Sequence, residues 1–141
     1  MSNFAHSFDI RLEHRALASA ALTATATIAT LTEPAAQRTA YRTLVDIEAI
    51  KISANNELYE VIIQLSNDDF ATVEQGAVLS LGATEVRAGG SVDNAALDAY
   101  EMLWTTQVNG TSYAQWRVRL VASGTSPSIT MACHSAILGT V

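Results

Sequence analysis

The chain has 141 residues, of which 49% are hydrophobic and 16% charged, and its formal net charge is −6. This length fits one domain, which buries roughly two thirds of the surface that its unfolded chain exposes. Its eight basic residues include a single lysine, Lys51, and are scattered along the chain. Because nucleic-acid affinity needs clustered lysine and arginine, DNA or RNA is not an expected partner.

The sequence also disfavours a membrane protein and a disulfide-rich secreted protein. No apolar run reaches the ~20 residues of a membrane-spanning helix, so no membrane partner is expected. The N-terminus shows no basic region followed by a Leu-rich core, so we expect no secretory signal. Cys133 is the single cysteine, which excludes an intramolecular disulfide and a cysteine-rich zinc site.

Residues 1–33 are interpreted as an extended N-terminal arm. Within them, the apolar side chains of Phe8, Ile10 and Leu12 alternate with charged ones, a period of two that is typical of a half-buried strand or an extended arm. An Ala/Thr-rich stretch follows. We interpret it as extended too, because threonine at every second position from 23 to 27 outweighs the helix preference of alanine.

Residues 34–141 are expected to form the body of the protein from short strands. The apolar positions change parity between Ile47 and Ile50, which predicts a β-bulge near Ala49. Residues 84–99 make the longest irregular connection, in which Asp93-Asn94 would cap a short helical turn. The strand over 58–66 places four apolar side chains on one face: Tyr59, Val61, Ile63 and Leu65.

Residues 100–120 are predicted to form a hairpin. Asn109-Gly110 is a strong turn signal between two runs of strand formers. A two-residue loop would set Trp104 opposite Gln115 and mix the two faces. We therefore favour a three-residue loop that begins at Val108 and gives Gly110 the left-handed position of a bulge. The glycosylation pattern at 109–111 is more simply explained by this turn.

This loop also fixes the register of the predicted hairpin. Met102 would lie opposite Trp116, and Glu101 opposite Arg117 as a cross-strand ion pair. A slip by one residue would turn the aromatic face to water, so the burial pattern specifies the register. Both tryptophans, Trp104 and Trp116, are then core residues.

The strand count predicts the fold class. Six to eight short strands, without a helix long enough to connect parallel strands, are typical of an all-β protein. We predict an antiparallel β-sandwich or jelly roll (residues 34–141) with an extended N-terminal arm (residues 1–33).

Residue types that could carry chemistry do not form a reactive arrangement. Cys133 and His134 are neighbours in a strand, so their side chains point to opposite faces and the imidazole is badly placed to activate the thiol. A buried structural cysteine is the better interpretation. His6 and His14 would lie far apart in an extended arm, and the acidic pairs lack the spacing of a calcium loop. We therefore expect no catalytic residue, no metal, no cofactor and no enzymatic activity.

Two groups of residues are candidates for contact with a partner. Arg117 and Arg119 point away from the predicted core beside Gln115, either as a solvated face paired with Glu101 or as a partner surface, where arginine is enriched. The apolar residues of the arm pack either on their own sheet or on a neighbouring subunit. The interface candidates are Phe4, Phe8, Ile10, Leu12, Gln115, Arg117 and Arg119.

Several segments carry a family resemblance, and they lie at 58–70, 81–83, 109–113, 116–120 and 123–125. They resemble the jelly-roll cement, or decoration, proteins that cover the heads of short-tailed bacteriophages, as in the Bordetella phage cement family. The resemblance spans roughly residues 38–138 and includes no catalytic signature.

The resemblance implies a structural virion protein made in the host cytoplasm and bound in many copies to the outer surface of an icosahedral capsid. There, homo-oligomers (dimers or trimers) would bridge subunits of the major capsid protein. The negative charge suits an outward position, because packaged DNA repels it. A repeated lattice also multiplies weak contacts through effective concentration.

Two alternatives stay open. A carbohydrate-binding β-sandwich would display aromatic side chains on an exposed face, whereas both tryptophans are interpreted as core. A tail or neck component of the same virion would share the fold. The copy number per particle separates a head protein from a tail protein, because it is high for the first and low for the second.

Overall fold

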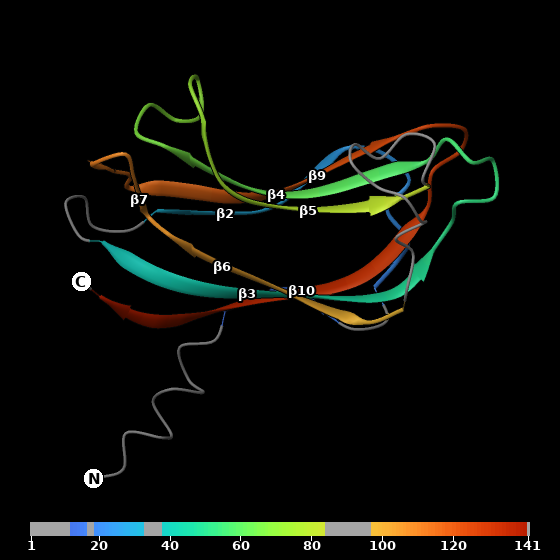
Figure 1. Ribbon diagram of the computed structural model, residues 1–141, viewed down its shortest axis with the longest axis horizontal. Helices are drawn as coiled ribbons and strands as arrows, with labels where there is room; N and C mark the ends of the chain where they lie inside the picture. The colour runs from blue at the N-terminus through green and yellow to red at the C-terminus, as the bar shows by residue number, and fades with distance from the viewer. Residues whose placement is uncertain (1–11, 17–18, 33–37, 84–96, 141) are drawn as a thin grey trace, which may run out of the picture.

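Two four-stranded antiparallel sheets face each other in the computed structural model, which describes residues 12–16, 19–32, 38–83 and 97–140 (Figure 1). Sheet A has the strand order β1-β10-β3-β6, and sheet B has the order β2-β9-β4-β5. The strands are β1 (Leu12–Arg15), β2 (Ala26–Thr32), β3 (Thr39–Ile50), β4 (Leu58–Ser66), β5 (Glu74–Gly82), β6 (Ala99–Thr105), β7 (Gln107–Val108), β8 (Thr111–Ser112), β9 (Gln115–Ser123) and β10 (Ile129–Thr140). The all-β antiparallel sandwich predicted from the sequence is confirmed.

No helix occurs in these described ranges, and hence none of a length and hydropathy that would span a bilayer. The predicted cap at Asp93-Asn94 lies outside the described residues. The predicted bulge near Ala49 is confirmed, because the register between β10 and β3 shifts from Thr130 opposite Ala49 to Met131 opposite Ile47.

The inner faces of the two sheets meet in a core of large apolar side chains. Trp104 of β6 and Trp116 of β9 come from opposite sheets, and their ring centroids are 4.8 Å apart. Only 4% of Trp104 and 0% of Trp116 is exposed, so the predicted burial of both indoles is confirmed. Tyr41 of β3 stacks on Trp104 at 4.6 Å, an arrangement that aromatic pairs favour. The predicted inner face of β4 is also confirmed, with Tyr59, Val61, Ile63 and Leu65 all at 0% exposed.

The predicted hairpin over 100–120 is wrong in its pairing. β6 pairs with β3 in sheet A, and β9 pairs with β2 and β4 in sheet B. Asn109-Gly110 does turn the chain, but as a two-residue loop between the short strands β7 and β8, with φ values of 49° and 80°. The alternation of apolar side chains specifies which face is buried. It does not distinguish a neighbouring strand from a strand in the facing sheet.

The predicted ion pair between Glu101 and Arg117 is also wrong, for the same reason. Glu101 lies in sheet A and forms its ion pair with Arg42 of the adjacent strand β3. Arg117 lies in the other sheet. The pair between Arg42 and Glu101 is about half exposed, so its contribution to stability is small.

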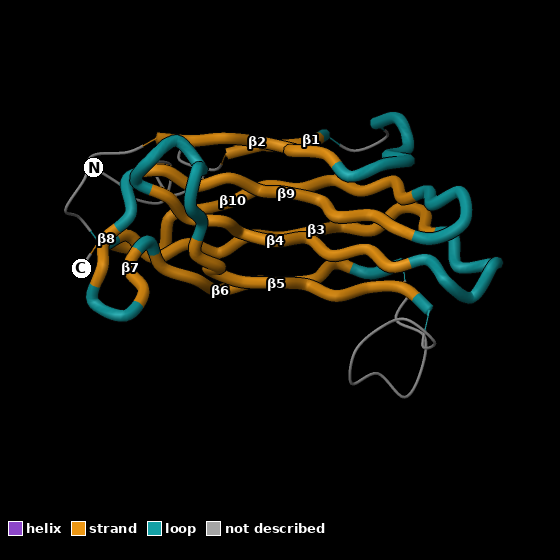
Figure 2. The backbone as a smooth tube through the Cα atoms, turned by 90° about the horizontal axis from the view of Figure 1, so that it is seen from above, coloured by secondary structure: helices purple, strands orange, loops and turns teal. Residues whose placement is uncertain are grey.

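The described part of the predicted N-terminal arm is extended, and its strands belong to the sandwich. β1 is an edge of sheet A against β10, and β2 is an edge of sheet B against β9 (Figure 2). Ile28 and Leu31 of β2 pack against the core. The sandwich therefore begins before residue 34, because the chain forms an edge strand of each sheet, β1 and β2, before it reaches β3.

Candidate functional site

Strand β9 turns the predicted contact residues Arg117 and Arg119 to the outside of sheet B. Its intervening residues Trp116, Val118 and Leu120 are fully buried. Because successive side chains of a strand point to opposite faces, the two arginines lie together on the solvent side. The sequence prediction of their direction is confirmed by this burial pattern.

Arg117 is held in place by two neutral groups. Its Nε atom donates a hydrogen bond of 2.7 Å to Oε1 of Gln64 on the neighbouring strand β4. Its guanidinium carbon lies 4.4 Å from the centroid of the Phe70 ring, a cation–π contact. Partial burial and the nearby charge of Arg119 lower the pKa of Arg117. The guanidinium therefore has a fixed orientation, and it has a like charge beside it.

Arg119 lies in a row of residues that crosses sheet B. It donates from a terminal nitrogen to Oγ1 of Thr27 at 3.0 Å, and on its other side lie Ile62 of β4 and then Val78 of β5. Val78 is 42% exposed. We call the surface formed by Thr27, Ile62, Gln64, Val78, Arg117 and Arg119 the arginine face.

The third predicted residue on β9, Gln115, supports the loop that carries Phe70. Its Oε1 accepts the backbone N–H of Asp69 at 2.8 Å. In the same loop the carboxylate of Asp68 accepts both the N–H and the hydroxyl of Thr72, and with the Ser66 hydroxyl these bonds lower the pKa of Asp68 to about 2. The loop is thus well connected, and it presents Phe70 to Arg117.

The other predicted contact residues belong to the arm. Phe4, Phe8 and Ile10 lie outside the described residues, and Leu12 is the first residue of β1. The structure brings together Gln115, Arg117 and Arg119 on one strand and adds to them neighbours from β2 and β4 that the sequence did not indicate.

Cys133 is a core residue. It is 0% exposed, and burial raises the pKa of its thiol to about 12. A thiol with so high a pKa is not a nucleophile near neutral pH. The predicted buried cysteine is confirmed.

A chain of hydrogen bonds crosses the buried inner face of sheet A, and the sequence patterns did not predict it. His14 Nε2 lies 2.8 Å from the hydroxyl of Ser135, which lies 2.7 Å from the hydroxyl of Thr43. That hydroxyl accepts a bond of 2.9 Å from Nε1–H of Trp104. The available signal was that Thr43 and Ser135 are polar residues at core positions of their strands.

The indole of Trp104 can only donate, so its bond to the Thr43 hydroxyl has a fixed direction. The two hydroxyls and Nε2 of His14 can each donate or accept, so the other two bonds can run in either direction. The His14 ring also meets Trp116 edge-on, with centroids 5.5 Å apart. Burial, and then the charge of His134, lower the pKa of His14 to about 4. The residue is therefore neutral at physiological pH.

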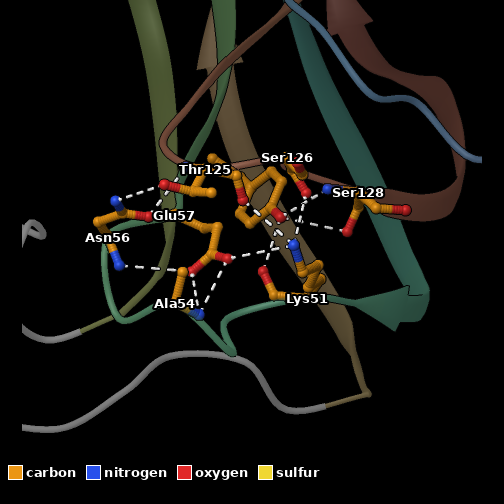
Figure 3. Close-up of polar contacts among 8 residues, drawn as sticks. Lys51, Ala54, Asn56, Glu57, Thr125, Ser126 and Ser128 are labelled. Atoms are coloured by element: carbon orange, nitrogen blue, oxygen red, sulfur yellow. Dashed lines mark hydrogen bonds and ion pairs between the residues drawn. The ribbon is translucent and has the colours of Figure 1, made fainter.

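At one end of the sandwich, two connections are joined by a polar cluster around Lys51 and Glu57 (Figure 3). The Lys51 ammonium donates to the backbone carbonyls of Thr125 and Ser126 at 3.1 and 2.9 Å, and it lies 3.7 Å from the Glu57 carboxylate. The Tyr59 hydroxyl donates to the Lys51 carbonyl at 2.7 Å. We call this cluster the loop clamp.

Glu57 is the buried anion of the loop clamp, since it is 0% exposed. Its carboxylate accepts the backbone N–H of Ala54 at 3.1 and 3.2 Å and that of Asn56 at 3.4 Å. Removal from water raises the pKa of Glu57, but these N–H donors and the Lys51 charge outweigh it and hold the pKa below its usual value. The cluster neutralises its own charges, so we assign it to stability and not to binding.

Within the described ranges, histidine, cysteine and acidic side chains form no group of three that could hold a metal ion. The arginine face offers guanidinium donors beside apolar side chains.

Comparisons with known proteins identify no family. No family model matches the sequence, and no curated protein matches it. Among solved structures, the chain is similar to the xylan-binding module CBM15, with a TM-score of 0.42 and 16% sequence identity over 89% of this chain and 82% of that one.

Proposed function

We propose that the chain is a structural virion protein, without enzymatic activity, that decorates the outer surface of an icosahedral phage head. It bridges adjacent subunits of the major capsid protein. The observation that carries this proposal is the arginine face, an exposed sheet surface on which oriented arginines adjoin Ile62 and Val78. Arginine beside apolar side chains is typical of surfaces where proteins meet.

The rest of the sandwich supports a structural task. The Cys133 thiol is buried, and the Glu57 carboxylate is neutralised inside the loop clamp. Such a protein would act by binding the assembled shell in preference to free capsid subunits, which shifts the equilibrium toward the shell. Two of the segments that resemble cement proteins, 58–70 and 116–120, overlap β4 and β9. Strand β9 carries both arginines, and β4 carries Gln64, the hydrogen-bond partner of Arg117.

A homo-oligomer, either a dimer or a trimer, is part of the proposal, because it would give each decorating unit several contacts with the lattice. Linked contacts raise the overall affinity without strengthening any single contact. The arginine face of each copy would then meet a separate capsid subunit.

The test is to locate the chain in purified particles of the phage that encodes it. Quantitative mass spectrometry gives its copy number, and electron cryo-microscopy of the particle gives its position. We expect a high copy number on the outside of the head. A low copy number at the tail or neck would favour the tail alternative, and absence from the particle would refute a virion role.

A carbohydrate-binding function is the competing proposal, and the burial of both tryptophans opposes it. The sequence contains two tryptophans, and both are buried between the sheets, so neither can stack on a sugar ring. Titration with soluble xylan, followed by tryptophan fluorescence, tests this alternative. Saturable quenching would favour the carbohydrate-binding function.

A further inference from the structure

We propose that the arginine face binds carboxylate side chains, so that its partner is an acidic segment of a capsid subunit. This inference rests on the proposed function and names the chemistry of the partner. It concerns Arg117 and Arg119 as an anion-binding pair that has no carboxylate partner among the residues that the structure describes.

Four described arginines, Arg15, Arg38, Arg117 and Arg119, have no carboxylate partner within the described ranges, and of these only Arg117 and Arg119 lie on one face of one strand. The chain has 14 acidic and 8 basic residues, so acidic partners are in excess. Among the described residues, Arg42 pairs with Glu101 and Lys51 pairs with Glu57. Over the same ranges, neither arginine of the arginine face has a carboxylate partner, and both are bonded to neutral side chains instead.

The two positively charged guanidinium groups also repel one another. They stand on alternate residues of one strand, whose Cα atoms are roughly 7 Å apart at ~3.3 Å per residue. Each positive charge raises the free energy of the other, and an external anion between them would remove that repulsion. A carboxylate bound here therefore gains from both cations.

The neutral partners orient the guanidinium groups and leave donors free for a ligand. Gln64 accepts a hydrogen bond from Nε–H of Arg117, and Thr27 accepts one from a terminal nitrogen of Arg119. A guanidinium has five N–H donors, so each arginine keeps others that can meet the two oxygens of a carboxylate. Because Phe70 and Gln64 already fix the position of Arg117, binding costs less conformational entropy.

The surroundings favour a protein carboxylate over a nucleic acid. Ile62 and Val78 lie in the same row as Arg119, so a partner that covers them would remove water from the ion pairs. Nucleic-acid affinity needs many lysine and arginine contacts with phosphates, and this face offers two arginines.

The first experiment uses a hexaglutamate peptide as the probe and a hexaglutamine peptide as its control. Nuclear magnetic resonance of the arginine Nε–H groups reports on each arginine of the full chain. We expect the Arg117 and Arg119 signals to move with hexaglutamate and to stay with hexaglutamine. The double variant Arg117→Gln/Arg119→Gln should bind hexaglutamate at least about tenfold more weakly, because two charge-assisted contacts are lost.

The control variant is Arg42→Gln, which removes an exposed arginine of sheet A that already has an acidic partner. It should bind hexaglutamate as the wild type does. Thermal unfolding of each variant verifies that the sandwich still forms. Unmoved arginine signals, or an equal loss in Arg42→Gln, would overturn the inference.

Two further probes test the identity of the occupant. A single-stranded DNA decamer that binds as tightly as hexaglutamate would overturn the choice of a protein carboxylate. Self-association of the chain that hexaglutamate reverses would show that the occupant is a second copy, and would overturn the choice of a capsid subunit.

The second experiment separates this inference from the proposed function. Particles are assembled with the wild type, Arg117→Gln/Arg119→Gln or Arg42→Gln, and the copies on the shell are counted. We expect at least a tenfold loss of occupancy for the double variant alone. Unchanged occupancy would refute the acidic partner and leave decoration intact, whereas a wild type absent from the shell would refute decoration itself.

Discussion

The loop clamp and the arginine face both contain cationic side chains, but only the loop clamp pairs its cation with a carboxylate of the described chain. In the loop clamp, the Lys51 ammonium contacts two carbonyls and a buried carboxylate of the same chain. On the arginine face, Arg117 and Arg119 contact only neutral groups among the described residues. The first arrangement stabilises the fold, and the second leaves attraction for an external anion. Substitutions should therefore separate the two regions by their effect on folding.

The largest effect should come from removing the anion of the loop clamp. Glu57→Ala would leave the N–H groups of Ala54 and Asn56 without their acceptor and the Lys51 ammonium without its carboxylate. We expect a greater loss in the free energy of unfolding than for any other change considered below. Urea unfolding measures it, with Glu60→Ala on the outer face of β4 as the matched control. Equal midpoints for the two variants would contradict a stabilising role for the clamp.

A smaller effect is expected from the hydroxyl that joins the same two connections. Tyr59→Phe removes the donor to the Lys51 carbonyl and the acceptor of the Ser128 N–H, at 2.7 and 2.8 Å. The ring stays buried, so the loss should be ~1–2 kcal/mol in the free energy of unfolding. The control is Tyr113→Phe, since Tyr113 lies at the edge of the core. A loss no larger than that of the control would show that the bond contributes little.

The burial of His14 should make stability depend on pH. The pKa of His14 is about 4 in the folded state and 6.5 ordinarily, so between these values the unfolded chain binds more protons. Stability should be complete above pH 6.5 and fall by ~1 kcal/mol as the pH decreases to 4, after allowance for solvent screening.

Urea unfolding at a series of pH values tests this expectation, with His14→Gln as the comparison. The variant should lack the loss between pH 6.5 and 4. Asp68, whose pKa is lowered from 3.8 to about 2, acts in a separate and more acidic window. Its contribution is present above pH 3.8 and is lost as the pH falls toward 2. Parallel curves for wild type and variant from 6.5 to 4 would exclude His14 as the cause.

The smallest effect on folding is expected at the arginine face. Arg117→Gln/Arg119→Gln removes two like charges and no ion pair within the described residues. The free energy of unfolding should stay within ~0.5 kcal/mol of the wild type, or rise slightly at low salt. Thermal unfolding at low and high salt measures it. A marked loss of stability would mean that this face serves the fold, as the loop clamp does.

Sequence patterns predicted the local features of the site correctly. The outward direction of Arg117 and Arg119 follows from strand parity. Trp116, before them, and Val118, between them, are apolar and buried. The neighbours that orient the arginines could not be predicted, because Gln64 and Thr27 come from strands far away in the sequence. The contact of His14 with Ser135 joins residues 121 positions apart and was missed for the same reason.

The sequence by itself determined which side of each strand is buried and where the chain turns, as at Tyr59 and at Asn109-Gly110. These features depend on the alternation of side chains along one strand and on the φ angles of one turn, both of which are local. Only the tertiary structure decided that β6 pairs with β3 and β9 with β4, so that the two tryptophans meet across the core. An apolar face lowers its free energy equally well against a neighbouring strand or a facing sheet, so the periodicity of one strand cannot select its partner.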